Sequence, residues 1–273
     1  MSVPRVPILI ANYRGGEVTQ LCIESVWRFT PQGGYRLIVC NDYDPLDTDG
    51  PYLRTARDRG WLELIEPKER LHHGGVLNIL WNETDLGDAR VAVNLDNDVQ
   101  VKDFGWLDDF QRCFDNPLTL AACDLREHNC VSNQGYIPPM YRFWYAAVNV
   151  PAYRDLGGVD WRFAYASRND WPYAEMFKDV EKLPLKQKEH PDFKPDLVAL
   201  DPGSKFWVKV QHENPKGYWV VPVPASARAK HHHIGHVSHM AELPDDYDAY
   251  TRIHKQARRA LISEELRRLR CLD

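Results

Sequence analysis

The chain has 273 residues, 44% of them hydrophobic, and carries a formal net charge of −5. This length suits one large α/β domain, or a domain with an appendage, and the apolar content allows a sizeable core. The acidic balance argues against a general nucleic-acid coat protein, while leaving room for a local basic groove. Six cysteines without a CxxC pair, no run of membrane-spanning length and no signal core predict a reduced, cytoplasmic protein.

The first hundred residues alternate short apolar runs with amphipathic stretches. Strands are predicted at 6–13, 35–44, 62–67 and 89–98, and helices at 17–29, 51–60 and 75–84. The strand runs are apolar throughout, which is typical of a parallel sheet covered by helices on both faces. Ligands bind at the carboxyl ends of such strands. Polar clusters stand at three of these ends: Tyr13 with Arg14, Asn41 with Asp42, and Asp96 with Asn97 and Asp98.

From residue 104 onward the pattern changes. Further helices are predicted at 106–114 and 151–160, and strands at 118–126, 140–150 and 218–225. Residues 178–217 show little periodicity and are interpreted as a long excursion or a lid. We expect one domain over residues 1–240 and a C-terminal amphipathic helix over 241–273, packed on it or extending from it. The apolar stripe expected on that helix is Tyr250, Ile253, Ala257, Leu261, Leu266 and Leu269.

The pair Asp96 and Asp98 is the first candidate for chemistry. Two carboxylates one residue apart can converge on a hard cation such as Mg²⁺ or Mn²⁺. A polar loop tip explains most chance pairs of this kind, but the position after a buried strand favours a metal. Five histidines follow later, at 231, 232, 233, 236 and 239. Three interpretations stay open for them: a hydrogen-bonded polar loop, a zinc site, or one histidine that completes the aspartate site.

A second candidate lies in residues 157–177. Gly157 and Gly158 are expected to end a helix, and Asn169 or Asp170 to cap the next one, with Pro172 in its first turn. A helix N-terminus favours an ionised carboxylate. Capping would therefore also keep Asp170 charged and available as a general base.

Taken in order, these motifs resemble the family 2 glycosyltransferases with a GT-A fold, over roughly residues 6–240. The residues that carry the resemblance are Ala11-Asn12-Tyr13 after the first strand, Asn41-Asp42 after the second, Asp96-Asn97-Asp98 after the fourth, Gly157-Gly158-Val159-Asp160 followed by Asn169-Asp170, and His233-Ile234-Gly235-His236-Val237-Ser238. The resemblance implies a three-layer α/β fold with a mixed central sheet. It also implies metal-dependent, inverting transfer of a sugar from a nucleotide-diphosphate donor to an acceptor hydroxyl.

Residue roles follow from the same resemblance. The residues implied to contact the nucleotide sugar are Ala11, Tyr13, Arg14, Asp42, Asn78, Asp96 and Asn97. Mn²⁺ or Mg²⁺ would be bound by Asp96, Asp98 and His233, and Asp170 would be the catalytic base. The residues implied to contact the acceptor are Trp144, Trp161, Asn169 and Trp171. Asp42 offers only acceptor atoms, and with Tyr13 it favours UDP over GDP. Leu77 precedes Asn78 where the family has arginine, so Arg70, His72 or His73 is expected to serve instead. Asn169 replaces the usual glutamate.

Two other functions compete with this one. A sugar-phosphate nucleotidyltransferase shares the layout and the metal, but it usually carries a glycine-rich loop with a lysine, and "ANYRGGEV" has no such lysine. A non-catalytic carbohydrate-binding relative is the alternative outside catalysis. The acceptor is expected to be a glycan or another hydroxyl-bearing molecule, with modified nucleic acid as a minor alternative. For the arginines of the last helix, a solvated face is favoured over a basic surface that binds an anionic polymer.

Overall fold

The computed structural model describes residues 5–126, 130–131, 135–178, 192–234 and 249–271. The strands are β1 (Val6–Asn12), β2 (Tyr35–Asn41), β3 (Glu63–Ile65), β4 (Val91–Asp96), β5 (Val99–Val101), β6 (Thr119–Arg126), β7 (Cys130–Val131), β8 (Tyr136–Ile137), β9 (Met140–Asn149), β10 (Ala164–Ser167), β11 (Leu197–Leu200), β12 (Trp219–Val221) and β13 (His231–His233). The helices are α1 (Glu17–Phe29), α2 (Gly50–Asp58), α3 (His72–Asn78), continued by a π-helical turn (Ile79–Glu83), α4 (Trp106–Arg112), α5 (Val150–Asp155), α6 (Tyr173–Met176), α7 (Pro202–His212), α8 (Ala225–Ala229) and α10 (Ala249–Arg270).

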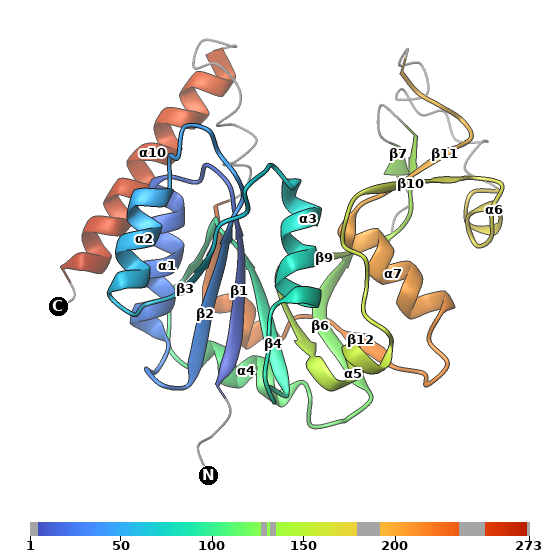
Figure 1. Cartoon of the computed structure of the whole chain (residues 1–273), viewed down its shortest axis with the longest axis horizontal. Helices are drawn as coiled ribbons and strands as arrows, with labels where there is room; N and C mark the ends of the chain where they lie inside the picture. Colours follow the sequence, from blue (N-terminus) through green and yellow to red (C-terminus); the bar gives the residue numbers. More distant parts are fainter. Residues whose placement is uncertain (1–4, 127–129, 132–134, 179–191, 235–248, 272–273) are drawn as a thin grey trace.

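The main sheet has seven strands in the order β12-β6-β9-β4-β1-β2-β3. Strand β1 pairs in parallel with both β2 and β4, whereas β9 runs antiparallel to β4 and β6. The carboxyl ends of β1, β2 and β4 therefore meet at one rim of the sheet (Figure 1). The prediction of an α/β fold with a mixed central sheet is confirmed.

Helices cover both faces of this sheet, which explains the uninterrupted apolar strands. Ile8 and Ile10 of β1 pack on one face, in a cluster with residues of α1, α2 and α4. Leu9 and Ala11, the alternate positions, pack on the other face with residues of α3, α5 and α7. A strand that is buried on both sides needs an apolar side chain at every position, so alternation is absent.

A smaller sheet, in the order β10-β11-β8-β7, forms a separate lobe beside α7 (Figure 1). The described part of residues 178–217, which were interpreted as an excursion or a lid, contains β11 and α7. Helix α7 carries a start signal that the periodicity did not bring out. The side chain of Asp201 accepts a hydrogen bond from the backbone N–H of Ser204 at 2.8 Å, and Pro202 occupies the first turn.

Helix α10 lies against the outer side of α1 (Figure 1). Ile262, Leu266 and Leu269 are buried against Val18 and Leu21. The predicted stripe is correct at Leu266 and Leu269 but wrong at Leu261, which is 41% exposed. The side chains expected at 250, 253 and 257 lie outside the described residues. Among the helices that the structure describes, none combines the length and apolar character that crossing a bilayer requires.

Candidate metal and nucleotide site

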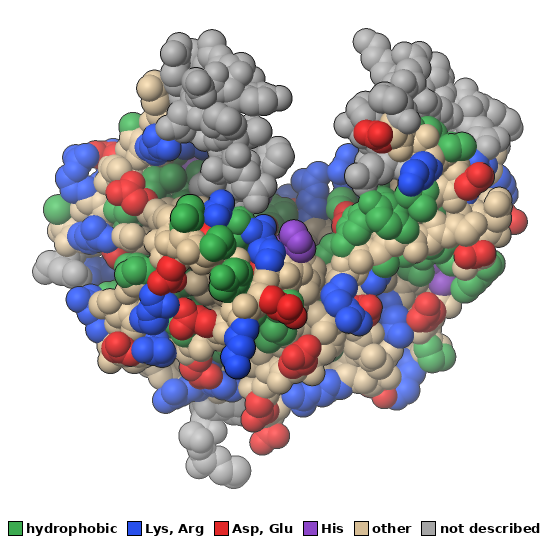
Figure 2. Space-filling model, turned by 45° about the horizontal axis from the view of Figure 1, so that its top comes forward, with side chains coloured by type: hydrophobic (Ala, Val, Ile, Leu, Met, Phe, Trp, Pro, Cys, Tyr) green, Lys and Arg blue, Asp and Glu red, His purple; other side chains and the backbone are tan. Residues whose placement is uncertain are grey.

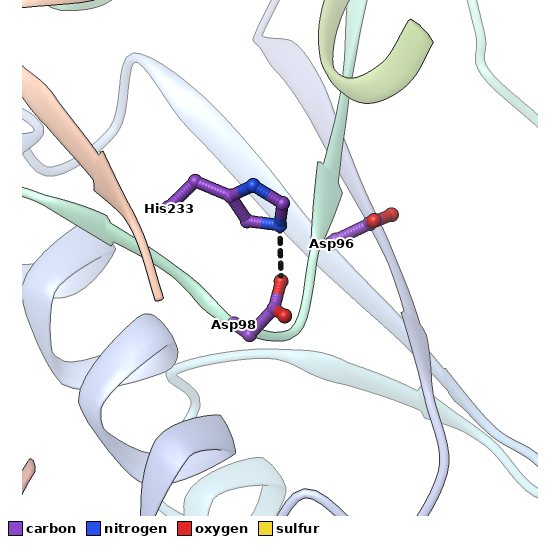
Figure 3. Close-up of side chains that lie close together, drawn as sticks. All are labelled: Asp96, Asp98 and His233. Carbon is purple, nitrogen blue, oxygen red and sulfur yellow. Dashed lines mark ion pairs between the residues drawn. The ribbon is translucent and has the colours of Figure 1, made fainter. Parts of the chain in front are cut away.

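The centre of the site is the turn that follows β4. Asp96 is the last residue of β4, and Asp98 lies just before β5. Strand β13 pairs antiparallel with β5 and places His233 opposite Val99, and the N–H of Ile234 donates to the carbonyl oxygen of Asp98 at 2.9 Å. This short pairing brings a distant histidine to the aspartates, as Figure 3 shows.

Ligand atoms of Asp96, Asp98 and His233 lie within 4.8 Å of one another. The Nε2 atom of His233 lies 3.2 Å from Oδ1 of Asp98, whose side chain is only 8% exposed (Figure 3). That buried Oδ1 makes no well-aligned hydrogen bond in the described part of the chain. Two carboxylates and an imidazole form a donor set that Mn²⁺ accepts, and the Asp98 oxygen lacks the partner that a cation would provide.

Electrostatics at this turn also suit a cation. Burial raises the pKa of Asp96, and the charge of Asp98 adds to that effect, while His73 and His233 oppose it. Burial alone would lower the pKa of His233, but its close contact with Asp98 and the charges of both aspartates outweigh burial, so the pKa is raised. A bound divalent cation would favour the ionised carboxylates and the neutral imidazole.

Trp144 lies beside the candidate metal site. Its ring stacks on His233 with the centroids 4.3 Å apart and an interplanar angle of 11°. The next residue of β9, Tyr145, pairs with Leu95 of β4. Strand β9 thus fixes Trp144 beside the last residues of β4, and the tryptophan holds the orientation of the imidazole. One face of Trp144 is therefore occupied by His233, and only its remaining surface is available for other contacts.

The second polar cluster lies around Asp42, immediately after β2. Its Oδ1 accepts the backbone N–H groups of Leu71 and Tyr43, at 2.8 and 3.0 Å. Its Oδ2 lies 3.0 Å from Nε of Arg70. The guanidinium of Arg70 also stacks on Tyr13, 3.2 Å from the ring centroid. Two residues expected to contact a nucleobase are therefore adjacent, and Arg70 covers both of them.

The loop after β1 is held by carboxylates from the segment that follows β2. Arg14 has a positive φ of 46° and donates to Oδ1 of Asp44 through Nε and Nη2, at 3.0 and 2.7 Å. Asp49 accepts the backbone N–H groups of Gly15 and Gly16, at 2.8 and 2.7 Å. A side chain at Gly15 would collide with Thr19. The positions of Tyr13 and Arg14 are thus fixed before any ligand arrives.

Asn97 has a different environment from its two neighbours. It is 5% exposed, and its amide nitrogen donates to Oδ1 of Asn12 at 2.7 Å and to Oγ1 of Thr19 at 3.2 Å. Asn12 in turn donates to Asp49 at 2.8 Å. This buried network ties the turn after β4 to the start of α1. Asp49 and Thr19 carry no sequence signal of this network, because an aspartate before a helix has the pattern of an ordinary capping residue.

Asn78 and Trp161 lie away from the places that the resemblance implied. The amide nitrogen of Asn78 donates to Glu83 at 3.3 Å and its oxygen accepts from Asn82 at 2.9 Å, so both groups are engaged at the far end of α3. Trp161 has no exposed surface and donates to the hydroxyl of Tyr153 at 2.8 Å. We therefore assign Asn78 to the helix and Trp161 to the core, as corrections. His73, whose charge lowers the pKa of Asp96, stands at the N-terminal end of α3.

Asp170 and its neighbours follow β10 in the smaller lobe. The N–H of Asp170 donates to the carbonyl of Ser167 at 3.1 Å, and Asp170 and Asn169 are both exposed. Helix α6 starts at Tyr173 after Pro172, without a side-chain cap, so the prediction that Asn169 or Asp170 caps it is wrong. Trp171 is 67% exposed. Ala11 of β1 pairs with Asp96, which sets its backbone beside the metal site.

The face at the carboxyl ends of the strands is hollowed between the main sheet and the smaller lobe (Figure 2). Lysine and arginine side chains lie at the hollow, and hydrophobic side chains gather on the edge of the lobe. Exposed aromatic residues of this lobe are Phe163, Tyr165 and Trp171. Phe163 is close to the start of α3, since its backbone nitrogen lies against Gly74. Gly235, His236, Val237 and Ser238 of the late histidine motif, and His239, lie outside the described residues.

No family model and no curated protein matches the chain. Solved structures do match. One is the mannosyltransferase PcManGT from Pyrobaculum calidifontis in complex with GDP-Man and Mn²⁺, with 18% identity and a TM-score of 0.45 over 57% of this chain and 47% of that one. Another is S. aureus TarS, with 10% identity and a TM-score of 0.43 over 77% and 39%.

A third similar structure is GalNAc-T7 with UDP, GalNAc and Mn²⁺, with 11% identity and a TM-score of 0.45 over 73% of this chain and 43% of that one. The chain therefore spans less than half of the length of each of these three proteins.

Proposed function

We propose that the protein is a metal-dependent glycosyltransferase of the GT-A type. It would move a sugar from a nucleotide-diphosphate donor to an acceptor hydroxyl with inversion at the anomeric carbon. One observation carries the proposal: Asp96, Asp98 and His233 converge at the end of β4. The neighbouring strands bring Tyr13 and Asp42 to the same rim. A cation site next to a flat ring and a buried carboxylate matches the parts of a nucleoside diphosphate.

Asp98 and His233 are the residues proposed to hold Mn²⁺ or Mg²⁺, with Asp96 as a further ligand or a contact to the ribose. Bound there, the cation would act as a Lewis acid that stabilises the leaving diphosphate. The chain contributes a rigid frame: Trp144 fixes the imidazole of His233, and the pairing of β13 with β5 fixes its backbone. Asn97 contributes to the frame through its buried bonds, which hold the turn that carries both aspartates.

The nucleobase is proposed to lie against Tyr13 and to donate an N–H to Asp42. Oδ1 of Asp42 already accepts two backbone N–H groups, so Oδ2 is the atom that a base would use. Arg70 is paired with that atom and covers Tyr13. Donor binding would therefore exchange the guanidinium for the base, and Arg70 would stay near the ligand. Uracil, with a single N3–H facing a single carboxylate oxygen, favours UDP over GDP.

Asp170 is proposed as the general base that accepts the proton of the acceptor hydroxyl as it attacks. It is exposed at the edge of the smaller lobe, after β10, and can meet an acceptor that enters from solvent. Asp160, the nearest alternative in the motif, is less suited. Hydrogen bonds from Arg162 lower the pKa of Asp160 to about 2, and Lys205 adds to this. A carboxylate with so low a pKa is a weak base.

The acceptor is proposed to bind between Asp170 and the exposed aromatic residues of the same lobe. Trp171 and the pair of Phe163 and Tyr165, whose rings meet edge to face at 4.9 Å, offer apolar surface for the faces of sugar rings. Asn169 can add a polar contact, and Trp144 can close the site from the metal side. A glycan therefore fits this rim better than a nucleic acid does.

The proposal is tested by nucleotide release. Purified protein would be incubated with UDP-glucose, UDP-N-acetylglucosamine, UDP-galactose and GDP-mannose, with Mn²⁺ or with EDTA. We expect slow hydrolysis of at least one UDP-sugar with Mn²⁺, its loss with EDTA, and its recovery when Mn²⁺ is restored. An Asp98→Asn variant should be inactive under all conditions. If no donor is cleaved and neither UDP nor GDP binds in the presence of Mn²⁺, the proposal fails.

A further inference from the structure

The strand that carries His233 belongs to the smallest of the sheets that the structure describes. Strand β13 pairs with β5 in a sheet of two strands, and the N–H of Ile234 extends the pairing by donating to the carbonyl oxygen of Asp98 at 2.9 Å. A ribbon of two strands is only marginally stable in water unless other elements pack on it. The position of His233 therefore depends on the elements that support this ribbon.

The two sides of β13 have different neighbours. On one side, the ring of His233 stacks on Trp144. Neighbouring side chains of an extended chain point to opposite sides, and Ile234 packs against an apolar cluster that α1 and α10 form together. The buried members of this cluster are Val18 and Leu21 of α1 and Ile262, Leu266 and Leu269 of α10. The C-terminal helix thus helps to build the surface on which the segment after His233 rests.

A hydrogen bond joins α10 to the other strand of the ribbon. Nε2 of Gln100, the middle residue of β5, donates to Oε2 of Glu265 at 2.9 Å. Gln100 is buried and stands opposite His232 of β13. The second carboxylate oxygen of Glu265 accepts from Arg268, three residues later in the helix, at 3.1 Å. The carboxylate is therefore held in place by its own helix while it holds β5.

Helix α10 runs beside α1 in the same direction (Figure 1). Ser263 donates to Glu17, the first residue of α1, at 3.0 Å, and seven residues later Arg270 donates to Glu24 at 2.9 and 2.7 Å. Because α1 follows β1, it starts at the carboxyl rim of the sheet. The part of α10 around Ser263 therefore lies at the rim, whereas Arg270 lies about two turns farther away.

We propose that α10 is a positioning element of the candidate metal site. Through Ile262 and Glu265 it would hold β13 on β5, and so keep His233 opposite Asp98. The inference rests on the proposed function at one point, which is that His233 binds the cation. It also gives the C-terminal helix a role in the reaction, although the helix lies behind the site and contributes no ligand to it.

Loosening of α10 should reduce metal affinity through the population of the paired ribbon. When a binding-competent arrangement is only partly populated, the apparent affinity falls in proportion to the fraction that is competent. A ribbon that is open for about nine-tenths of the time would thus bind the cation about tenfold more weakly. The same opening would expose the N–H of Ile234 to solvent, which can be measured without any metal.

The first set of variants tests the polar contact. Glu265→Ala removes the acceptor of the bond from Gln100, whereas Glu265→Gln keeps an oxygen that can accept it. Glu264→Ala is the matched control, because Glu264 is the preceding residue of the same helix and pairs with Arg267 and Arg268 instead.

The second set tests the apolar contact. Ile262→Ala and Leu269→Ala each remove a buried side chain from the same cluster, but Ile262 lies at the rim and Leu269 lies about two turns away. A loss of overall stability should therefore be common to both variants, and an effect on the ribbon should be specific to Ile262→Ala. Two quantities would be measured on the full chain: the hydrogen-exchange rate of the Ile234 N–H by NMR without metal, and the affinity for Mn²⁺ in the presence of UDP by calorimetry.

We expect Glu265→Ala and Ile262→Ala to speed up exchange at Ile234 and to weaken Mn²⁺ binding by about tenfold, as the loss of an outer-shell partner of a metal ligand does. Glu265→Gln, Glu264→Ala and Leu269→Ala should match the wild type in both measurements. The proposal is overturned if exchange at Ile234 is unchanged in both test variants, or if Ile262→Ala and Leu269→Ala have equal effects. Faster exchange without weaker Mn²⁺ binding, in a protein whose wild type binds the ion, would overturn it as well.

Failure of the proposed function can be recognised separately. If the wild type binds no Mn²⁺ with UDP, the assignment of the cation site fails. Exchange at Ile234 would then still decide the present inference, because faster exchange in Glu265→Ala and Ile262→Ala supports the hold of α10 on β13, and unchanged exchange contradicts it.

Discussion

The imidazole of His233 and the carboxylate of Asp98 face each other at 3.2 Å, although a large part of the chain separates them in sequence. Their meeting depends on the pairing of β13 with β5, which places His233 opposite Val99. In the proposed function this pair holds the cation, and its two members can be tested one at a time.

Asp98→Ala should abolish the binding of Mn²⁺ that accompanies nucleoside diphosphate. Asp98 is buried and its Oδ1 has no well-aligned partner in the described part of the chain, so its loss removes one of the proposed ligands of the cation. Loss of an outer-shell partner alone typically costs about 10–100-fold in metal affinity, and loss of a ligand should cost more. Calorimetry with Mn²⁺ and UDP measures this. Equal binding by wild type and variant would remove Asp98 from the metal site.

Substitution of His233 and of His231 by alanine should have different effects on metal binding and on stability. His233→Ala should weaken Mn²⁺ binding by about 10–100-fold or more. His231 instead packs on Tyr145 with ring centroids 3.7 Å apart, and burial lowers its pKa, so His231→Ala should reduce thermal stability and leave metal affinity unchanged. Titration and thermal melts of both variants compare the two effects. Metal-dependent turnover that survives His233→Ala but not His231→Ala would reverse the assignment.

Asp42 should determine which nucleobase the site binds. UDP with Mn²⁺ should raise the melting temperature more than GDP does, and CDP or ADP should have little effect. In the Asp42→Asn variant, the amide oxygen can still accept the N–H of Leu71, but the amide nitrogen would place a hydrogen-bond donor opposite the N–H of the nucleobase. An unsatisfied buried donor costs about 1–3 kcal/mol, so UDP affinity should fall by roughly 5- to 150-fold. A thermal shift produced by ADP or CDP alone contradicts this assignment.

Asp170→Asn should lower turnover by about 10²–10⁴-fold, the usual contribution of a general base. Affinity for the donor and for Mn²⁺ should change little, because the residue lies in the smaller lobe and is not expected to touch the nucleotide. Folding should be unaffected, since Asp170 does not cap α6. The measurements are transfer rates with the best donor and UDP titrations. Weaker donor binding at unchanged turnover would assign Asp170 to the donor site and leave Glu175 as the candidate base.

Asp44 should make the free energy of unfolding decrease as the pH falls into the acid range. Burial would raise its pKa, but hydrogen bonds from Arg14, Thr48 and two backbone N–H groups outweigh burial and hold the pKa well below its usual range. A depressed pKa in the folded state stabilises the protein above the unfolded pKa of about 3.9, and this contribution is lost as pH falls toward the folded value. Asp44→Asn should therefore cost about 1.5–3 kcal/mol at pH 7 and progressively less below pH 4.

Urea denaturation at pH 7 and at pH 3 measures this difference. Asp58→Asn is the control, because Asp58 forms an exposed pair with Arg57 that should contribute at most about 1 kcal/mol. A gap between wild type and Asp44→Asn that stays constant from pH 7 to pH 3 would show that the carboxylate charge is not the cause.

The sequence by itself determined the layers and the position of the rim. Strands with an apolar residue at every position, such as residues 6–12, must be covered on both faces. This signal lies within the sequence of each strand, so it can be recognised without knowing the strand's neighbours. The helix over residues 17–29 has the same bounds in the structure as in the prediction. Asp42, Asp96 and Asp98 could be predicted because each lies at or just after the end of a buried strand, so chain order alone places them at one edge.

Tertiary structure decided which side chains meet at that edge. The sequence left the five histidines equivalent until the resemblance singled out His233, and the pairing of β13 with β5 is what carries it to Asp98. Three further features could not be predicted from the sequence, because each depends on contacts between segments far apart in the chain. They are the stacking of Arg70 on Tyr13, the hydrogen bonds from the loop after β1 to Asp49, and the burial of Trp161. Periodicity reports which face of an element is buried, but not which neighbour covers it. For that reason the same motif pattern fixed the rim of the sheet and misplaced Asn78.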